Sequence, residues 1–422
     1  MLSKLSGKWY LKILILGLLI RVILMPITLH PDLWGHTFTA YFFAYEGKLN
    51  VYEYMVNLPK DHPILTTFSI NDIFIYPPLA YFSLGFFRLA IKPFVDPNFV
   101  PFVMSHMADL YSRNDLKLNI FLYKLPYIFF DLGLGFMISN FFTDIVKKKK
   151  ALILWILNPV TLYATFMIGQ FDILPVFFVV LSYFLVAKNK PYWAMLSLGI
   201  GGSYKMFPLL FILPLAFVLT SNVKQRIKYT ISGFLPFVLI ILPFIGSSVF
   251  RQMVLFSPKS QKMLFMGFPV SGAEVLFPFV ILLCLFYFYL YYLKNKYEIN
   301  NIFIFILLLI FSITHYHPQW FLWITPFFII DLLKRDFKHW ELVAILVGCW
   351  FIIIMMFDQT LNIGLFNPLN ESLSYVAPLS SYIQRYFDVN LLKSLVRSIF
   401  AGASIFYLYL LSKEDKILIN DK

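Results

Sequence analysis

Charged residues are scarce in this chain. Only 14% of its 422 residues are Asp, Glu, Lys or Arg, whereas a soluble domain carries about 25%. Hydrophobic residues make up 60% of the sequence, and aromatic residues alone make up 20%. A water-soluble core cannot bury so much apolar surface, so the composition excludes an ordinary soluble enzyme and indicates an integral membrane protein.

Cysteine is rarer still, because only Cys284 and Cys349 are present. Each lies in a separate apolar run, where a free thiol packs as a small hydrophobic side chain, so the pair says nothing about redox compartment. A cleavage site of small residues is also missing after the first apolar run, which Arg21 interrupts. We therefore expect an uncleaved first span rather than a secretory signal.

The net charge of +13 is compatible with nucleic-acid binding, but its distribution is not. Lysine and arginine form short clusters at the ends of the apolar runs, which is the pattern that fixes membrane orientation. No nucleic-acid partner is therefore expected.

We predict an all-α polytopic membrane protein with about twelve transmembrane helices and both termini in the cytoplasm, because this topology places the basic clusters inside. The chain is expected to form one membrane domain over residues 1–422, most simply in the plasma membrane. The predicted spans are 10–29, 120–142, 151–169, 173–187, 192–204, 207–220, 228–248, 273–293, 300–314, 318–333, 340–357 and 392–412.

Two segments decide that count. The apolar segment 76–91 contains Arg88, and a crossing there would place the cluster 147–150 outside. We expect this segment to lie in the outer interface as an amphipathic helix. The segment 192–220 separates two basic clusters, so we expect a hairpin of two short arms with Lys205 near its apex.

This topology leaves outer loops at 30–119, 249–272 and 358–391, the first of which is large and is expected to contain interfacial helices. Six of the seven histidines fall in these loops or at the outer membrane edge. We therefore expect any chemistry on the outer face.

Candidate site residues lie on that face. Asp32 directly follows the first span, where partial desolvation suits a carboxylate to act as a general base, although a helix cap or a loop position would also explain it. In the motif from Gly169 to Asp172, the aspartate suits an N-cap of the next helix. Gln170 suits a hydrogen bond to a sugar hydroxyl.

Lys205 is a sharper signal, because a lysine within the membrane costs roughly 2.5 to 3.5 kcal/mol and requires an anionic partner. A lipid phosphate would serve, and the alternative is that the side chain snorkels to the headgroups. The turn with His315, His317 and Gln319 carries two histidines without a third ligand. It predicts phosphate or sugar binding, or a passive turn, rather than a metal site, and no cofactor is expected.

Arg21 and Asp131 lie at similar depths in the first two spans, roughly 12 to 15 Å from the outer end at about 1.5 Å per residue. Two unpaired charges at that depth are costly. We therefore predict an intramembrane ion pair between them.

Taken in order, the motifs resemble the GT-C superfamily of multispan glycosyltransferases, which use mannose or glucose linked to dolichyl or polyprenyl phosphate. The resemblance covers residues 20–215 and includes Asp32 after the first span, Tyr76-Pro-Pro-Leu, Lys124-Leu-Pro with Asp131, Asn158-Pro before Gly-Gln-Phe-Asp, and Gly-Gly-Ser-Tyr-Lys-Met-Phe-Pro around Lys205. It implies a GT-C-like module at about 1–220 and a variable transmembrane module at about 221–422.

The resemblance also implies that Asp32 is the catalytic base, with Glu46 and Glu53 as the nearest acidic rivals. The expected substrate-binding residues are Tyr76, Gln170, Asp172, Lys205, His315, His317 and Gln319. Many related mannosyltransferases carry a paired Asp-X-Asp in this loop, whereas Leu33-Trp34 follows the single Asp32 here.

The implied reaction moves a hexose, expected to be mannose, from a polyprenyl-phosphate-sugar to a glycan, lipid or protein acceptor at the outer membrane face, with inversion. No glycine-rich nucleotide loop is present, in agreement with a lipid donor. A transporter or flippase of a lipid-linked or polar solute is the leading alternative. Such proteins usually place polar sites near the midplane and often contain inverted repeats, and the sequence has neither pattern. A non-catalytic membrane scaffold is the third interpretation, and it would leave the large outer loop and Lys205 without a role.

Overall fold

The computed structural model describes residues 8–68, 73–293 and 298–420. Nearly all regular structure in these ranges is helical, in agreement with the predicted all-α class. Five helical segments are long and apolar enough to cross a membrane: Tyr10–Ile27, Leu116–Ser139, Ile145–Met167, Val223–Phe244 and Val389–Glu414. Five shorter apolar helices accompany them: Ile173–Ala187, Phe207–Leu219, Pro278–Tyr292, Ile299–Ile313 and Trp340–Met355. Helix occupies part of each of the twelve predicted spans, but the number of crossings stays a prediction.

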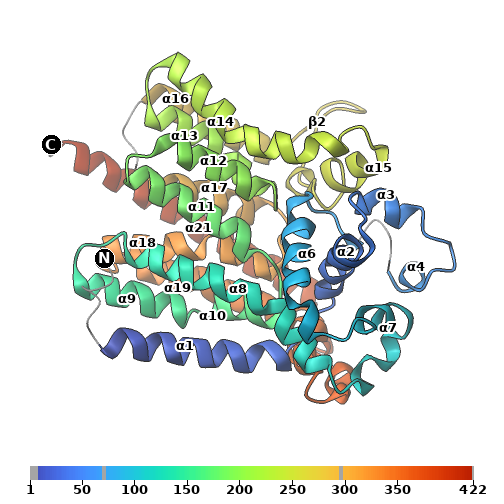
Figure 1. Ribbon diagram of the computed structural model, residues 1–422. Coiled ribbons are helices and arrows are strands. Elements are labelled where there is room, and N and C mark those ends of the chain that lie inside the picture. The colour runs from blue at the N-terminus through green and yellow to red at the C-terminus, as the bar shows by residue number, and fades with distance from the viewer. Residues whose placement is uncertain (1–7, 69–72, 294–297, 421–422) are drawn as a thin grey trace.

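Helices from the first 241 residues form a layer of roughly parallel and antiparallel helices (Figure 1). Its main members are α1 (Lys8–Ile27), α8 (Leu116–Ser139), α9 (Ile145–Ile156), α11 (Ile173–Ala187), α12 (Pro191–Gly202) and α14 (Val223–Ile241). Helices α12 and α14 approach each other closely, because a Cβ on Gly199 would lie 2.1 Å from the Gly233 carbonyl oxygen. Small residues let membrane helices pack this closely.

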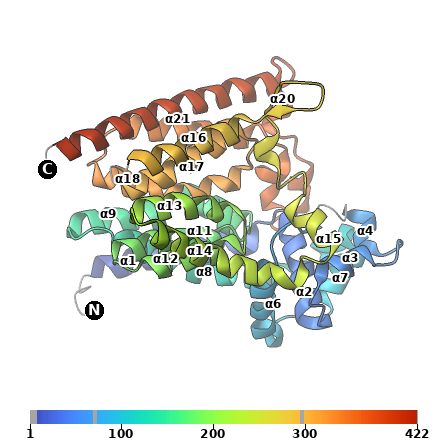
Figure 2. The ribbon, with the colours of Figure 1, turned by 90° about the horizontal axis from the view of Figure 1, so that it is seen from above.

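The later long helices pack beside this layer (Figure 2). They are α16 (Pro278–Leu293), α17 (Ile299–Ile313), α18 (Thr325–Lys334), α19 (Trp340–Met355) and α21 (Val389–Asn420). Helix α13 (Ile212–Leu219) packs against both α14 and α16 and so connects the two groups. Helix α21 packs against α17 and α19. It ends at the end of the bundle where α1 begins (Figure 1), as the predicted topology requires of two termini on one side.

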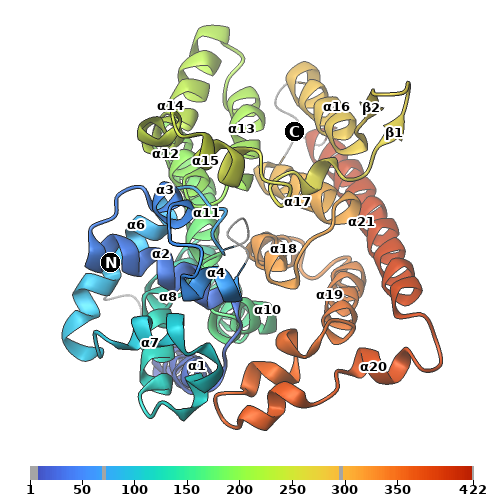
Figure 3. The same ribbon diagram turned by 90° about the vertical axis from the view of Figure 1, so that its right-hand side faces the viewer.

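Short helices cover the opposite end of the bundle, which Figure 3 views face on. They are α2 (Asp32–Glu46), α3 (Val51–Val56), α4 (Pro63–Thr67), α6 (Leu79–Ile91), α7 (Phe99–Ser105), α15 (Ser248–Phe250) and α20 (Leu379–Ile383). Helix α6, predicted to lie in the interface, runs across the direction of the long helices (Figure 1). We refer to this end as the outer end.

Short segments connect these elements. The 3-10 segments are η2 (Lys92–Phe94), η3 (Met107–Ser112), η5 (Phe207–Phe211), η6 (Leu242–Phe244), η8 (Lys262–Leu264), η9 (Pro318–Trp323), η10 (Gln359–Leu361), η11 (Ile363–Phe366) and η12 (Glu371–Tyr375). The helix α10 (Pro159–Thr161) runs into a π-helical turn, η4 (Leu162–Met167), and a second π turn is η7 (Arg251–Leu255).

One predicted span begins later than expected. Residues 268–276 form a small antiparallel hairpin of β1 (Phe268–Pro269) and β2 (Val275–Leu276) instead of the start of the span 273–293. Helix α16 begins at Pro278, which suits the first helical position because proline lacks the N–H that would be unpaired there.

The predicted ion pair between Arg21 and Asp131 is confirmed. Arg21 Nε donates to Asp131 Oδ2 at 2.7 Å, and both side chains are fully buried. Arg21 Nη1 also donates to the carbonyl oxygens of Gly17 and Ile156, each at 2.9 Å. The pair therefore ties α1 to α8 and α9 inside the bundle.

Candidate active site

A buried lysine holds together the two chain segments that carry the site. Lys124 on α8 is fully buried, and its Nζ lies 2.6 Å from the Thr28 carbonyl oxygen and 2.9 Å from the Phe166 carbonyl oxygen. Two further carbonyls and the Thr28 hydroxyl lie within 3.3 Å of Nζ. Carbonyls at helix C-termini lack partners within their helix, and the Lys124 amino group supplies hydrogen bonds to them. Lys124 thereby places the residues before Asp32 next to the residues before Gln170.

Gly169 allows the chain to turn over this lysine. Its φ of 81° lies in the left-handed region that favours glycine. A Cβ at this position would also lie 2.9 Å from Lys124 Cε. Glycine therefore satisfies both the backbone conformation and the close approach, and the turn presents Gln170 to Asp32.

Asp32, the first residue of α2, belongs to a hydrogen-bonded chain of side chains. Gln170 donates from Nε2 to Asp32 Oδ2 at 2.6 Å. Because the amide nitrogen faces Asp32, the amide oxygen faces His36 and accepts from its Nε2 at 3.1 Å. This arrangement sets the hydrogen of neutral His36 on Nε2. The Asp32 side chain remains 42% exposed, and its Oδ1 lies 3.6 Å from His30 Nδ1, so the carboxylate is oriented and accessible.

The surroundings keep Asp32 ionised and the neighbouring histidines neutral at pH 7. Burial raises the pKa of Asp32, but the charges that His30 and His36 carry in the acid range where Asp32 titrates, together with the hydrogen bond from Gln170, outweigh burial and leave this pKa below its ordinary value. Burial lowers the pKa of His36 to about 4 and also lowers the pKa of His30. Asp32 is therefore free to accept a proton, while the histidines supply hydrogen bonds rather than charge.

A second cluster joins Lys205 to Asp172. Lys205 lies in the turn between α12 and η5, where the sequence predicts the apex of a hairpin. Its Nζ lies 2.8 Å from each carboxylate oxygen of Asp172, and Trp323 Nε1 donates to Asp172 Oδ1 at 2.6 Å. Lys205 is 6% exposed and Asp172 is fully buried.

The ion pair rules out one interpretation of each residue, namely snorkelling for Lys205 and a helix N-cap for Asp172. Lys205 does not snorkel to the headgroups, because its ammonium is bound inside the protein. The N-cap interpretation of Asp172 is wrong as well: the residue precedes α11, but its side chain accepts no capping hydrogen bond. Its two oxygens instead face Lys205 and Trp323.

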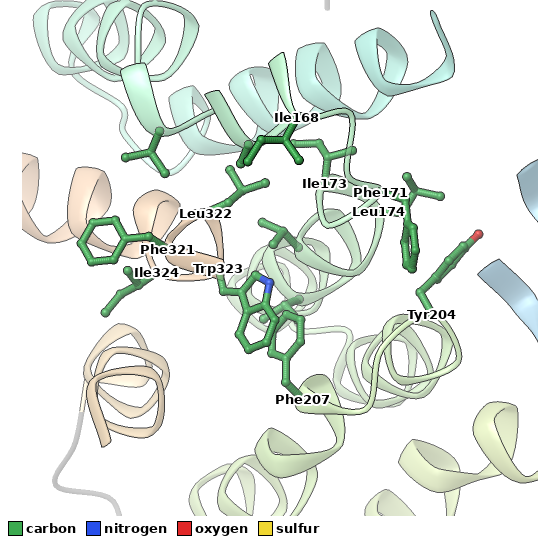
Figure 4. Packing of buried hydrophobic residues seen from close by; sticks show 14 of the residues in the cluster. Ile168, Phe171, Ile173, Leu174, Tyr204, Phe207, Phe321, Leu322, Trp323 and Ile324 are labelled. Carbon is green, nitrogen blue, oxygen red and sulfur yellow. The ribbon is translucent and has the colours of Figure 1, made fainter. Parts of the chain in front are cut away.

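Aromatic rings enclose Lys205 and connect the two clusters. Its Nζ lies 4.8 Å from the centroid of the Tyr76 ring and 5.2 Å from that of Phe171, distances at which a cation is attracted to a ring face. The His36 ring contacts both of these rings. Trp323 lies flat on Phe207, with centroids 3.9 Å apart (Figure 4). The Asp32 chain and the Lys205 pair therefore form one site.

The histidine turn, which contains His315, His317 and Gln319, adjoins this site. These three residues differ in how deeply they are buried and in whether they interact with the site. His317 is half-buried, and burial together with the charge of Lys262 lowers its pKa to about 3. His315 is exposed, with its ring 5.8 Å from that of His317, and desolvation lowers its pKa to about 4. Gln319 is buried, and its Oε1 has no hydrogen-bond partner among the residues that the structure describes. Asp32 and Lys205 both act electrostatically on His317, so His317 is the histidine of this turn that joins the site.

The two acidic rivals of Asp32 are engaged elsewhere. Glu46 Oε2 accepts from the Tyr54 hydroxyl at 2.7 Å. Glu53 accepts a hydrogen bond from the Ser247 hydroxyl. Asp32 is the acidic residue of this loop that hydrogen-bonds to Gln170 and reaches the site.

Sequence reasoning missed several members of the site, including Trp323, which donates to Asp172. His36 lies four residues after Asp32 on the same helix, a spacing that places both side chains on one face and that could have revealed it. Trp320 follows the histidine turn and stacks on Trp323, with centroids 4.8 Å apart. Lys262 lies in an outer loop without a periodic pattern, and its Nζ is 5.5 Å from the Trp320 ring centroid.

The comparison with curated proteins gave no match. A family model, Glycosyltransferase family 87, matches residues 74–261. This range contains Tyr76, Gln170, Asp172 and Lys205; it begins after Asp32 and ends one residue before Lys262. The predicted GT-C resemblance is thus confirmed over residues 74–261, where the chain matches glycosyltransferase family 87, a GT-C-type family of multispan membrane glycosyltransferases.

Proposed function

We propose that this protein transfers a hexose, with mannose as the first candidate, from a polyprenyl-phosphate-sugar to an acceptor hydroxyl at the outer membrane face. The observation that carries the proposal is the state of Asp32, an accessible carboxylate that Gln170 orients. Aromatic rings connect it to the buried ion pair of Lys205 and Asp172. The family match supports the glycosyltransferase class. The apolar helices support a donor that is anchored in the bilayer.

In the proposed reaction, Asp32 takes the proton of the acceptor hydroxyl. The acceptor oxygen forms a bond to the anomeric carbon while the bond from that carbon to the phosphate oxygen breaks, and the electron pair of the broken bond stays on the phosphate. A single displacement of this kind inverts the anomeric carbon. Because the pKa of Asp32 is below its ordinary value, the proton moves late, once attack has made the hydroxyl acidic.

Gln170 and His36 are proposed to position Asp32. The amide of Gln170 can satisfy both neighbours in one orientation only, because a flipped amide would set its oxygen against the Asp32 carboxylate. Its fixed orientation therefore fixes the carboxylate. Preorganisation of this kind supplies catalysis without reorganisation during the reaction.

The remaining residues are proposed to bind the donor. An ammonium group has three N–H donors, so Lys205 can hold Asp172 and still offer one donor to the phosphate. Tyr76 stays protonated because burial raises its pKa, which suits it to donate to a sugar or phosphate oxygen. His315, His317 and Gln319 are proposed as neutral partners of the phosphate or the sugar hydroxyls.

The test uses membranes that contain the protein, incubated with radiolabelled polyprenyl-phosphate mannose and, separately, polyprenyl-phosphate glucose. Label in a new glycosidic product is expected with one donor, and membranes with the Asp32→Asn protein serve as the matched control. A product whose label does not depend on Asp32 would overturn the proposed base. Movement of intact donor across the membrane without a new glycosidic bond would favour a transporter instead.

A further inference from the structure

Lys262 lies at the edge of the site, on a short helical segment that contains none of the motifs described above. It begins η8, which packs against α16. Its Nζ lies 5.5 Å from the centroid of the Trp320 ring, and Trp320 stacks on Trp323, which donates to Asp172. Lys262 and Lys205 therefore lie at two ends of one aromatic stack, since the Lys205 ammonium is 6.0 Å from the Trp323 ring centroid.

The two lysines of the site differ in whether a carboxylate neutralises them. Lys205 forms an ion pair with Asp172, so this pair adds no net charge. The histidines are neutral at pH 7, because the pKa of His36 is about 4 and that of His317 about 3. Among the residues that the structure describes, no carboxylate lies at ion-pair distance from Lys262.

A departing lipid phosphate requires an additional cation. A sugar phosphodiester carries one negative charge, whereas a released phosphate monoester carries about 1.5 to 2 at pH 7. Asp32 is negative before it takes the proton, so an uncompensated positive charge is needed in the site. An electrostatic group already aimed at the developing charge is the most effective form of stabilisation.

We infer that Lys262 binds the phosphate of the lipid donor as a free cation beside Trp320, while Lys205 keeps most of its charge for Asp172. This inference rests on the proposed function, because it assumes a prenyl-phosphate ligand. It assigns the phosphate subsite to the outer loop 256–277 as well as to the helical bundle.

The titration of Lys262 gives the inference a pH signature. Burial, with smaller contributions from the charges of Lys259 and Lys205, lowers its pKa to about 8 against the opposing effect of Asp32. His315 and His317, which face it from the histidine turn, are neutral at this pH. A bound phosphate favours the protonated amine. Above pH 8 the free protein must take up a proton to bind the phosphate, so affinity falls.

The experiment measures the binding of farnesyl phosphate to the purified full-length protein in detergent, from pH 6.5 to 9.5. Lys262→Gln is expected to weaken binding at pH 7 about tenfold or more, because one charge-assisted contact is lost. Lys262→Arg is expected to bind within about threefold of wild type and to lack the decline above pH 8, because arginine stays protonated. Lys259→Gln, which removes an exposed charge three residues earlier in the same loop, is the matched control.

Two further ligands, farnesol and inorganic phosphate, distinguish binding of the lipid tail from binding of the phosphate. Farnesol is expected to bind equally to wild type and Lys262→Gln, and inorganic phosphate is expected to compete with farnesyl phosphate only in proteins that keep a cation at position 262. Equal farnesyl phosphate binding by wild type and Lys262→Gln would overturn the inference, as would equal losses in Lys259→Gln and Lys262→Gln. If wild type binds no farnesyl phosphate, the proposed function itself fails, which distinguishes the two results.

Discussion

Two buried ion pairs of this protein have nearly the same geometry and different surroundings. Arg21 and Asp131 meet at 2.7 Å inside the bundle, and Lys205 and Asp172 meet at 2.8 Å near the outer end. Arg21 is further satisfied by the carbonyls of Gly17 and Ile156, so it serves helix packing. Lys205 instead faces aromatic rings that also contact His36, which belongs to the hydrogen-bonded chain of Asp32.

The difference shows that burial and pairing do not by themselves identify a functional charge. A buried ion pair stabilises a fold little more than well-packed apolar residues would, and breaking one leaves an uncompensated charge. The residues around each pair indicate whether the pair serves helix packing or the candidate active site. We therefore expect changes at the inner pair to affect stability alone and changes at the outer cluster to affect transfer.

The largest effect is expected at Asp32. Asp32→Asn keeps the shape and the hydrogen bond from Gln170 but removes proton acceptance, so the transfer rate should fall about 10²- to 10⁴-fold. Farnesyl phosphate binding and the melting temperature should stay close to wild type. Full transfer activity in this variant would move the search for the base to Glu46, Glu53 and Asp172.

The inner pair gives the opposite pattern. Arg21→Met leaves the Asp131 carboxylate buried and unpaired, which should cost about 3 to 5 kcal/mol of stability. Thermal unfolding in detergent should show a lower melting temperature, while transfer per folded molecule stays unchanged. The double variant with Asp131→Leu should recover much of the loss, because an apolar pair can replace a buried ion pair. An unchanged melting temperature in Arg21→Met would contradict the structural role.

The outer pair should combine both effects, and a second substitution separates them. Lys205→Met strands the Asp172 carboxylate and should destabilise the protein by about 3 to 5 kcal/mol. Adding Asp172→Asn removes that charge and keeps an acceptor for Trp323, so the melting temperature should recover. Donor use should remain about tenfold or more below wild type. A double variant with normal donor kinetics would show that this pair, like the inner one, is purely structural.

The smallest expected effect concerns His36. Its folded pKa is about 4, whereas an unfolded histidine titrates near 6.5. The neutral side chain therefore stabilises the fold fully above pH 6.5, and this stability is lost as pH falls from 6.5 toward 4. Between pH 7 and 5.5 the loss should be about 1 kcal/mol, and His36→Gln should lack this part of the acid destabilisation. Identical pH profiles of melting temperature in the two proteins would exclude the buried neutral histidine.

The sequence predicts the inner pair because its two residues lie in regular spans, where counting residues gives depth. It does not predict the partner of Lys205, because Asp172 occupies a position that suits a helix cap and the partners lie on different elements. The chain of Asp32 and Gln170 joins residues 138 positions apart. Their contact depends on Lys124, whose role follows only from the position of two helix ends.

Loops are less predictable for a further reason. Apolar runs and the placement of basic clusters locate α6 and the hairpin around Lys205 to within a few residues. No such pattern exists in the loop that carries Lys262, and its position near Trp320 depends on how β1, β2 and α16 fold back. The function could be predicted without the position of this loop, because the prediction used the order of the GT-C-like motifs along the sequence.

The position of Lys124 predicts how the geometry of the site depends on dissolved ions. Broken helices in membrane transporters commonly expose carbonyls that coordinate Na⁺. Here the Lys124 amino group lies within 3.3 Å of five oxygen atoms at the ends of α1 and η4, so a tethered side chain occupies the position that a dissolved ion takes in such transporters. The spacing of Asp32 and Gln170 is therefore set by a side chain that cannot diffuse away. The geometry of the site should be the same in sodium, potassium or choline salts.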